Sequence, residues 1–146
     1  PGDVIYVSRQ PRYFSAVGAT GQTTTLSQLD RRFSFQDYNL TLNDALARAG
    51  GLQDDRANPL GVFLYREERS ATLRDIGLKV PATLGDTVPT IYMVDLSAPA
   101  GLFYCNQIWM RNRDTIYVSN APATDIQKFI SSVLPWTQSA FYASGV

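Results

Sequence analysis

A six-residue motif occurs twice in this chain and limits how the chain can fold. Asp-Val-Ile-Tyr-Val-Ser at residues 3–8 returns as Asp-Thr-Ile-Tyr-Val-Ser at residues 114–119, with five of the six positions identical. Both copies are β-branched and aromatic runs that follow a turn, so each predicts a strand. Chance agreement is the weaker explanation for so many matches in order. We therefore expect Val4–Val7 to close a preceding module, largely absent here, and Thr115–Val118 to close the module between the copies.

The first part of that module predicts short strands. Arg12–Val17, the turn at Gly18–Gly21 and the threonine-rich Gln22–Leu26 together predict a hairpin. Arg32–Phe35 predicts a further short strand. These strands precede the region with the clearest helical pattern.

Leu40–Ala49 predicts a helix. Thr41 can cap its start, with Asp44 three residues on in the capping-box position. Gly50 and Gly51 follow, at the position where a residue in the left-handed backbone conformation commonly ends a helix. The residues on its apolar face are Leu42, Ala45, Leu46 and Ala49.

The second part of the module predicts strands separated by polar segments. Asp54–Pro59 is expected to be a loop, and Val62–Arg66 a strand. The charged run Arg66–Arg69 predicts a turn at the tip of a second hairpin. Leu78–Pro89, which contains two prolines and a glycine, predicts a surface loop.

Thr90–Leu96 predicts another strand, and a short helix is expected after it, with Ser97 as its cap and Pro99 in its first turn. Strands, one main helix and further strands indicate an α+β module built on a mixed sheet.

The residue types present argue against an enzyme. The chain has no histidine, which removes the usual general base and the commonest metal ligand. A glycosidase needs only two carboxylates, but the acidic residues lie in turn-like stretches without a catalytic motif, which favours solvated surface charge. Those residues are Asp54, Asp55, Glu67, Glu68, Asp86 and Asp95. We predict no catalytic, cofactor or metal site.

Charge and hydropathy narrow the class further. The 13 basic and 13 acidic residues balance, so the basic excess of a nucleic-acid binder is missing. No apolar run of about 18 residues predicts a transmembrane helix. Cys105 is the single cysteine, so we expect a buried apolar thiol rather than an internal disulfide.

The segment Ala123–Leu134 predicts an amphipathic helix, with Asp125 in its first turn and Pro135 ending it. Aromatic residues follow this helix, and such residues are enriched at membrane–water interfaces. From the residues alone, the apolar stripe either docks on its own domain or approaches a membrane. The residues of this expected membrane-approach helix are Ile126, Phe129, Ile130, Val133, Leu134 and Trp136.

Two further groups have alternative interpretations. Aromatic side chains in or near the strands can stack on sugar rings, although filling a half-buried sheet face is commoner. They are Tyr92, Tyr104, Trp109 and Tyr117. Four arginines can meet an acidic polymer or pair across a subunit interface: Arg9, Arg12, Arg31 and Arg32. No ligand-binding residue is assigned.

At this point the residues resemble a known family. Leu42–Leu52, which ends in Ala-Gly-Gly-Leu, resembles the helix signature of SLBB domains, the soluble-ligand-binding variant of the β-grasp fold. The strand Val62–Arg66 and the closing Asp114–Val118 fit the same pattern. The order of elements, with an amphipathic helix at the end, is similar to the C-terminal part of outer-membrane polysaccharide export proteins. Leu78–Pro89 has no place in that pattern.

The resemblance implies three parts: residues 1–8 as the closing strand of a preceding module, 9–120 as the SLBB domain, and 121–146 as a truncated helix leading to the outer membrane. It implies a ring-shaped homo-oligomer in the periplasm and outer membrane of a Gram-negative bacterium. The implied partners are an exported capsule polysaccharide or exopolysaccharide and an inner-membrane polysaccharide co-polymerase. It also implies lipidation at an upstream cysteine, which Cys105 does not match.

Two rival classes remain. A soluble glycan- or ligand-binding β-grasp module would show a concave pocket with converging polar groups, whereas a ring would show self-complementary flanks. SLBB units also occur in DNA-uptake and electron-transfer accessories, but the balanced charge and the single cysteine argue against both.

Overall fold

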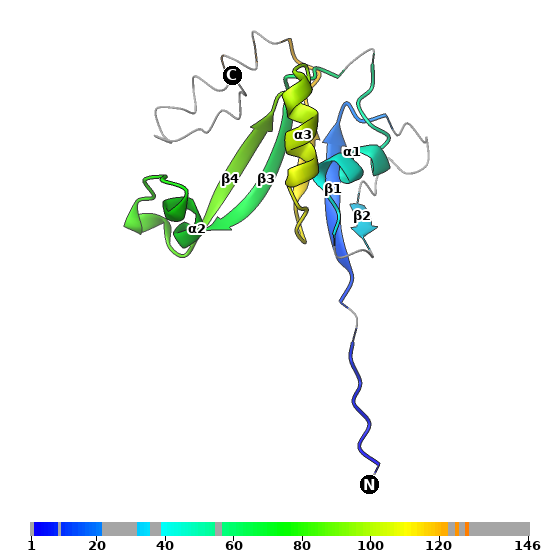
Figure 1. Cartoon of the computed structure of the whole chain (residues 1–146), viewed down its shortest axis with the longest axis vertical. Helices are drawn as coiled ribbons and strands as arrows, with labels where there is room; N and C mark the ends of the chain where they lie inside the picture. The colour runs from blue at the N-terminus through cyan, green and yellow to red at the C-terminus, as the bar shows by residue number, and fades with distance from the viewer. Residues whose placement is uncertain are drawn as a thin grey trace.

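The computed structural model describes residues 2–8, 10–21, 32–35, 39–54 and 57–122, together with residues 125 and 128. Within these residues, strands and helices follow one another along the chain and assemble around one mixed sheet (Figure 1). The elements are β1 (Arg12–Gly18), β2 (Arg32–Phe35), α1 (Leu42–Arg48), β3 (Val62–Arg69), α2 (Ser70–Asp75), a 3-10 turn (Ala82–Leu84), β4 (Thr87–Val94), α3 (Pro99–Gln107) and β5 (Thr115–Val118).

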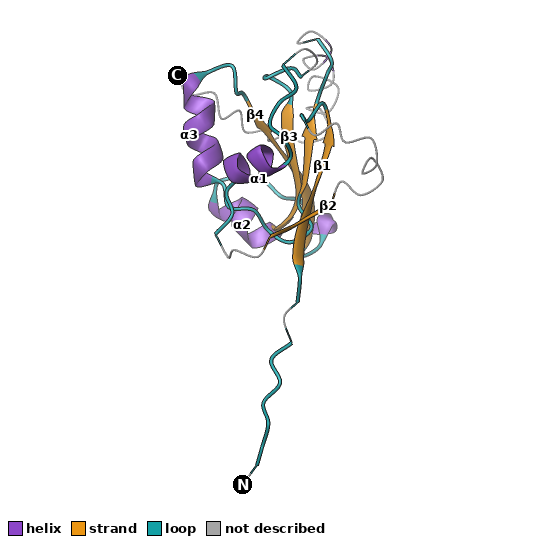
Figure 2. Cartoon of the chain, turned by 90° about the vertical axis from the view of Figure 1, so that its right-hand side faces the viewer, coloured by secondary structure: helices purple, strands orange, loops and turns teal. Residues whose placement is uncertain are grey.

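The sheet has the strand order β2-β1-β5-β3-β4. β5 lies at its centre, parallel to β1 and antiparallel to β3, while the outer pairs β1–β2 and β3–β4 are antiparallel. Helices α1 and α3 cover one face of the sheet (Figure 2). The predicted α+β module on a mixed sheet is confirmed, although two helices of similar length take the place of the one main helix expected.

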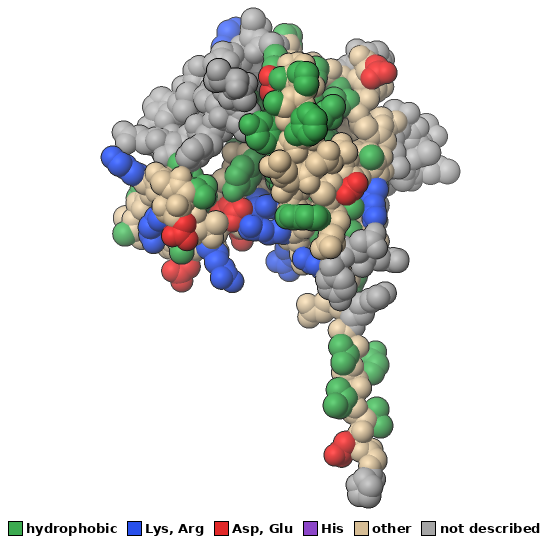
Figure 3. Space-filling view, viewed as in Figure 1, with side chains coloured by type: hydrophobic (Ala, Val, Ile, Leu, Met, Phe, Trp, Pro, Cys, Tyr) green, Lys and Arg blue, Asp and Glu red, His purple; other side chains and the backbone are tan. Residues whose placement is uncertain are grey.

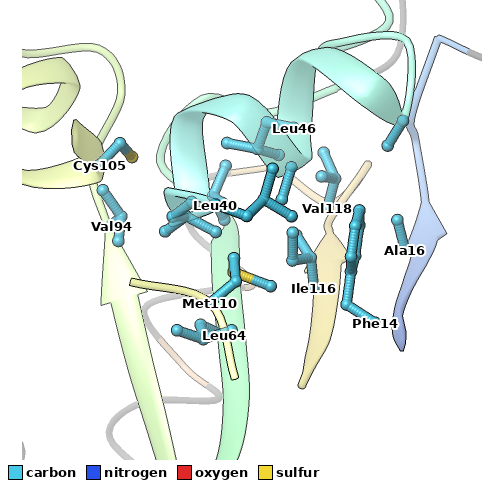
Figure 4. Close-up of a cluster of buried hydrophobic side chains, with 14 of the residues drawn as sticks. Phe14, Ala16, Leu40, Leu46, Leu64, Val94, Cys105, Met110, Ile116 and Val118 are labelled. Atoms are coloured by element: carbon cyan, nitrogen blue, oxygen red, sulfur yellow. The ribbon is translucent and has the colours of Figure 1, made fainter. Parts of the chain in front are cut away.

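The core lies between that face of the sheet and the two helices (Figure 4). Alternate residues of the central strands point into it, because successive side chains of a strand face opposite sides. From β5 these are Ile116 and Val118, which face Leu64 and Val62 of β3 in register. The apolar face predicted for α1 is buried against them.

Helix α1 begins and ends as its sequence predicts. The Thr41 hydroxyl accepts a hydrogen bond from the Asp44 backbone N–H at 3.1 Å, and the Asp44 carboxylate accepts one from the Thr41 N–H at 3.1 Å. At the other end, Gly50 and Gly51 have φ angles of 88° and 72°. This left-handed backbone lets the Gly51 N–H reach the Leu46 carbonyl at 2.8 Å and close the helix.

The predicted turn at Arg66–Arg69 is wrong. These residues extend β3, and their strand partners are Thr87–Thr90 of β4, which takes the end of the predicted Leu78–Pro89 loop into the sheet. The short helix α2 caps the pair instead (Figure 1). The charged run misleads because some of its side chains point inward and neutralise one another, so here polarity does not mark a turn.

Two smaller predictions also need correction or remain untested. Ser97 does not cap α3, whose first flanking residue is Ala98; the Ser97 backbone N–H and hydroxyl both bond the Asp95 carboxylate instead. The predicted strand Gln22–Leu26 lies outside the described residues. Within the described part of the chain, the antiparallel partner of β1 is β2.

The segment that carries the first copy of the repeat extends away from the domain beyond the start of β1 (Figures 1 and 3). No strand is assigned to residues 2–8. The large side chains Val4–Val7 are 84–90% exposed.

Gly18, the last residue of β1, allows a close approach between strands. A Cβ added there would lie 2.0 Å from the Val118 carbonyl oxygen, and φ is +91°. Both the space and the backbone conformation therefore require glycine.

We predict that Gly18→Ala lowers the free energy of unfolding by at least roughly 3 kcal/mol, because backbone strain and overpacking add. Gly77→Ala is the matched control: its φ is +88°, yet an added Cβ would meet nothing within 4 Å. That variant should cost only about 1 kcal/mol. Chemical denaturation of both variants tests this, and equal losses would contradict the role given to the β1–β5 contact.

Candidate functional site

The most distinctive group of polar side chains is a buried ionic cluster between β3 and β5. In the antiparallel register, Val62 faces Val118 and Leu64 faces Ile116. The next position of the same row brings Arg66 to Asp114. Its guanidinium donates from Nε to Oδ1 at 2.9 Å and from Nη2 to Oδ2 at 2.5 Å. The third pair of this core row is therefore a bidentate ion pair, with side chains only 7% and 2% exposed.

Glu68 extends the cluster along β3. Its carboxylate, 3% exposed, pairs with Arg111 Nη1 at 2.7 Å and lies 3.7 Å from Arg66 Nη1. The hydroxyl of Tyr92 on β4 donates to Glu68 Oε1 at 2.9 Å. Two acids and two arginines thus lie in one network, and only Arg111 reaches solvent substantially.

Backbone groups complete the cluster. Arg66 Nη2 also donates to the Trp109 carbonyl at 2.7 Å, and the Arg111 N–H donates to Asp114 Oδ2 at 2.6 Å. The segment between α3 and β5 is thereby tied to β3. Among the described residues, no buried side-chain nitrogen or oxygen lacks a hydrogen-bond partner.

Two members of the cluster, Tyr92 and Arg66, have raised pKa values. Burial raises the pKa of Tyr92 to about 12, and the hydrogen bond to Glu68 and its charge add to the effect. Burial opposes the charge of Arg66, but the bonds to Asp114 and the neighbouring carboxylates outweigh it, so the Arg66 pKa lies above its ordinary value. Neither group titrates near neutral pH, so neither serves there as an acid–base catalyst.

The position of the cluster suggests a structural role. β5 pairs with β3 only from Val62 to Tyr65, so the rest of β3 and the start of β4 form a two-stranded arm tipped by α2. A two-stranded ribbon is only marginally stable by itself. Charged side chains gather where this arm joins the body (Figure 3). The cluster therefore anchors the base of the arm.

The carboxylates considered for a glycosidase have different environments where the structure describes them. Asp54, Glu67 and Asp86 are exposed, as predicted, Asp95 is half-buried and accepts hydrogen bonds from Ser97, and Asp55 lies outside the described residues. Glu68 is an exception, because the expectation of surface charge is wrong there.

Sequence reasoning missed the role of Asp114, which it treated only as the residue before a strand. The available signal was its presence at the same position of both copies of the repeat.

The aromatic candidates are dispersed. Tyr117 stacks on Phe63 with 6.1 Å between ring centroids, on the sheet face opposite to the helices. Tyr92 is half-buried with its hydroxyl in the ionic cluster, and Tyr104 lies in helix α3 and not in a strand. Trp109 is 54% exposed.

The arginine candidates are only partly described. Arg12 stacks over Phe35 at 5.1 Å and Arg32 over Tyr13 at 4.7 Å, while Arg9 and Arg31 lie outside the described residues.

The residues predicted for the membrane-approach helix lie outside the described residues: Ile126, Phe129, Ile130, Val133, Leu134 and Trp136. In the part of the chain that is described, no helix has the length and apolar character needed to cross a membrane. That part also contains no group of three or more potential metal ligands among Cys, Asp and Glu.

The outer surface of α3 carries large apolar side chains. Leu102 and Phe103 are exposed, and Figure 3 shows hydrophobic side chains over this helix. Cys105, on its inner side, is fully buried, as predicted, and burial raises its pKa to about 11.

Comparison with known proteins identifies the domain. The family model of the SLBB domain matches residues 31–118, which include β2 to β5 and the whole ionic cluster. The chain belongs to the SLBB domain family. The resemblance inferred from the helix signature and the apolar strand that begins at Val62 is confirmed.

Three relatives of this chain are named as polysaccharide export proteins. The chain is 34% identical to the capsule polysaccharide export outer membrane protein CtrA of Neisseria meningitidis over 136 residues. These residues make up 90% of this chain and 33% of CtrA. It is 31% identical over 140 residues to the capsule polysaccharide export protein BexD of Haemophilus influenzae, 93% of this chain and 34% of BexD. The Vi polysaccharide export protein VexA/TviF of Salmonella typhi is 32% identical over 128 residues, 88% of this chain and 32% of that protein. The chain spans about a third of the length of these relatives.

We predict that Arg66→Met lowers the free energy of unfolding by about 3–5 kcal/mol, because Asp114 and Glu68 would remain buried with a positive partner removed. Arg69→Met, an exposed residue of the same strand, is the control and should change stability by less than about 0.5 kcal/mol. The double variant Arg66→Met/Asp114→Leu should recover part of the loss. Urea denaturation of the three variants tests the cluster, and equal effects of Arg66→Met and Arg69→Met would contradict its anchoring role.

We also predict that Cys105 resists alkylation by iodoacetamide at pH 8 in the native domain, since only the thiolate reacts and burial raises its pKa to about 11. Labelling should become fast when urea unfolds the domain. Mass spectrometry with and without urea measures both rates. Fast labelling of the native chain would show that α3 does not stay packed on the sheet.

Proposed function

We propose that this chain is a periplasmic, ring-forming module of an outer-membrane channel that exports capsule polysaccharide or exopolysaccharide in a Gram-negative bacterium. The observation that carries the proposal is the match of about nine-tenths of the chain to several polysaccharide export proteins. The relatives are named as export proteins and not as enzymes, which agrees with a non-catalytic role.

The proposed organisation has residues 1–8 as the closing strand of a preceding module, 9–120 as the SLBB domain, and 121–146 as the start of the segment that reaches the outer membrane. The second boundary is supported by the end of the domain. The Asn58 side chain donates to the Ala121 carbonyl at 2.8 Å, so the chain remains attached to the domain up to this point.

Two properties of the domain suit the wall of a conduit. Its buried charges are paired internally, and these pairs hold the base of the arm to the body of the domain. Exposed apolar side chains on α3 and at Trp109 are of the kind that packs on other protein surfaces, which supports assembly with further copies of the chain. A conduit must also release its cargo, so tight binding of the polysaccharide is not expected.

Within this proposal the partners are other copies of the same chain, the exported polysaccharide, the outer membrane and an inner-membrane polysaccharide co-polymerase. Nucleic acid is not a proposed partner, because the 13 basic and 13 acidic residues balance.

The test is the mass of the full-length protein, extracted from membranes in mild detergent and measured by native mass spectrometry. We expect a closed oligomer that dissociates when residues after Asn120 are deleted. The charged double variant Ile130→Asp/Leu134→Asp should also dissociate it, because both positions lie on the predicted apolar stripe. Ser131→Asp/Ser132→Asp, on the opposite side of that stripe, is the matched control and should leave the oligomer intact.

A soluble monomer that needs no detergent would overturn the channel proposal. It would favour the soluble glycan- or ligand-binding module, which was the alternative from the sequence.

A further inference from the structure

The two copies of the repeat have opposite environments in this structure. In the second copy, Asp114, Ile116 and Val118 are 0–2% exposed and point into the core from the central strand β5. In the first copy, the equivalent apolar residues Ile5 and Val7 are 88% and 84% exposed. The same sequence is thus a core element in one place and wholly solvated in the other.

A strand of this kind needs neighbours on both sides. β5 pairs with β1 along one edge and with β3 along the other. Its alternate positions match the core side of β3, so the motif is suited to a central rather than an edge position. A long apolar strand left unpaired is also a site for aggregation.

The first residue of the motif adds a specific chemical requirement. Asp114 begins the row that Ile116 and Val118 continue, and both of its carboxylate oxygens accept bonds from Arg66. Asp3 stands at the same position before Ile5 and Val7.

The residues that directly precede the two aspartates share the sign of one backbone angle. Gly2 and Arg113 both have positive φ, 127° and 72°. Arg113 is the only non-glycine residue with positive φ in the described chain, so the turn before Asp114 holds this residue in an unusual conformation. Glycine adopts it without strain.

We propose that Asp3–Ser8 is the buried central strand of a second sheet, formed with a part of the protein that precedes this chain, and that Asp3 binds an arginine of that sheet. That arginine continues a row of alternate apolar residues on its strand, as Arg66 continues the row of Val62 and Leu64 on β3. This inference rests on the proposed place of the chain within a longer export protein, and it adds a partner for Asp3 that the domain organisation alone does not specify.

The spacing of the chain constrains how the two sheets lie. Only three residues separate Ser8 from Arg12, the first residue of β1. Four Cα–Cα steps span about 14 Å at most. The central strand of the second sheet therefore leads almost directly into β1, and the two modules are neighbours with little freedom between them.

The experiment is hydrogen exchange with mass spectrometry on the full-length protein, with the 146-residue chain as reference. We expect the amides of residues 4–7 to exchange at least about a hundredfold more slowly in the full-length protein. Asp3→Asn should remove most of this protection while leaving residues 115–118 unchanged, because it leaves a buried arginine without its charge partner. Asp114→Asn should do the reverse, and Asp54→Asn, at an exposed acid, should change neither segment.

Unprotected exchange of residues 4–7 in the full-length protein would overturn the proposal. Protection that Asp3→Asn leaves intact, while Asp114→Asn removes protection from residues 115–118, would overturn the assignment of Asp3. Protection that appears in the 146-residue chain only as its concentration rises would assign the strand to a second copy instead. These outcomes are independent of the oligomer mass, so a monomeric protein with protected residues 4–7 would overturn the ring and leave this inference standing.

Discussion

The Arg66 guanidinium binds both oxygens of Asp114 in the third position of a row that begins with two apolar pairs. Most of the domain depends on this contact. It joins β3 to the start of β5, it places the turn that precedes β5, and it brings Arg66 beside Glu68, through which Arg111 and Tyr92 are held. The arm formed by the far ends of β3 and β4 begins where this network lies. An isolated two-stranded ribbon has no fixed direction. The base of this arm, in contrast, is bonded to Tyr92 of β4, to the start of β5 and to the segment after α3, and these bonds set its direction.

An apolar pair at this position could stabilise the sheet equally well, because the cost of burying charges offsets much of their attraction. What the ion pair adds is discrimination between registers. A slip of β5 by one residue would turn Ile116 out of the core and would leave two charged groups buried without partners. We therefore interpret the pair as a feature that fixes the register of this short central strand of four residues.

Local determinants explain which elements could be predicted from the sequence. Helix α1 was placed correctly because its cap, its apolar face and its terminating glycines all lie within about a dozen residues. The arm was missed because the partners of its charges are distant in the chain: Arg66 and Asp114 are 48 residues apart, and Glu68 and Arg111 are 43 apart. A run of charged residues predicts a solvated turn when only its neighbours in the sequence are considered. The predicted membrane-approach residues remain a prediction, since they lie outside the described residues.

The repeat and the helix signature support different conclusions about the protein. The signature identifies the family, whereas the repeat is the basis for our proposal that one arrangement of neighbouring strands occurs twice in the same protein. If each copy is a central strand whose register is fixed by an ion pair, the intervening link of three residues leaves the two modules little room to move independently. A wall built from such modules keeps its shape because each strand register is set by buried charge and each connection is short. A passage for a long polymer needs that property more than it needs a binding pocket, since a strong site would hold the chain that it should release.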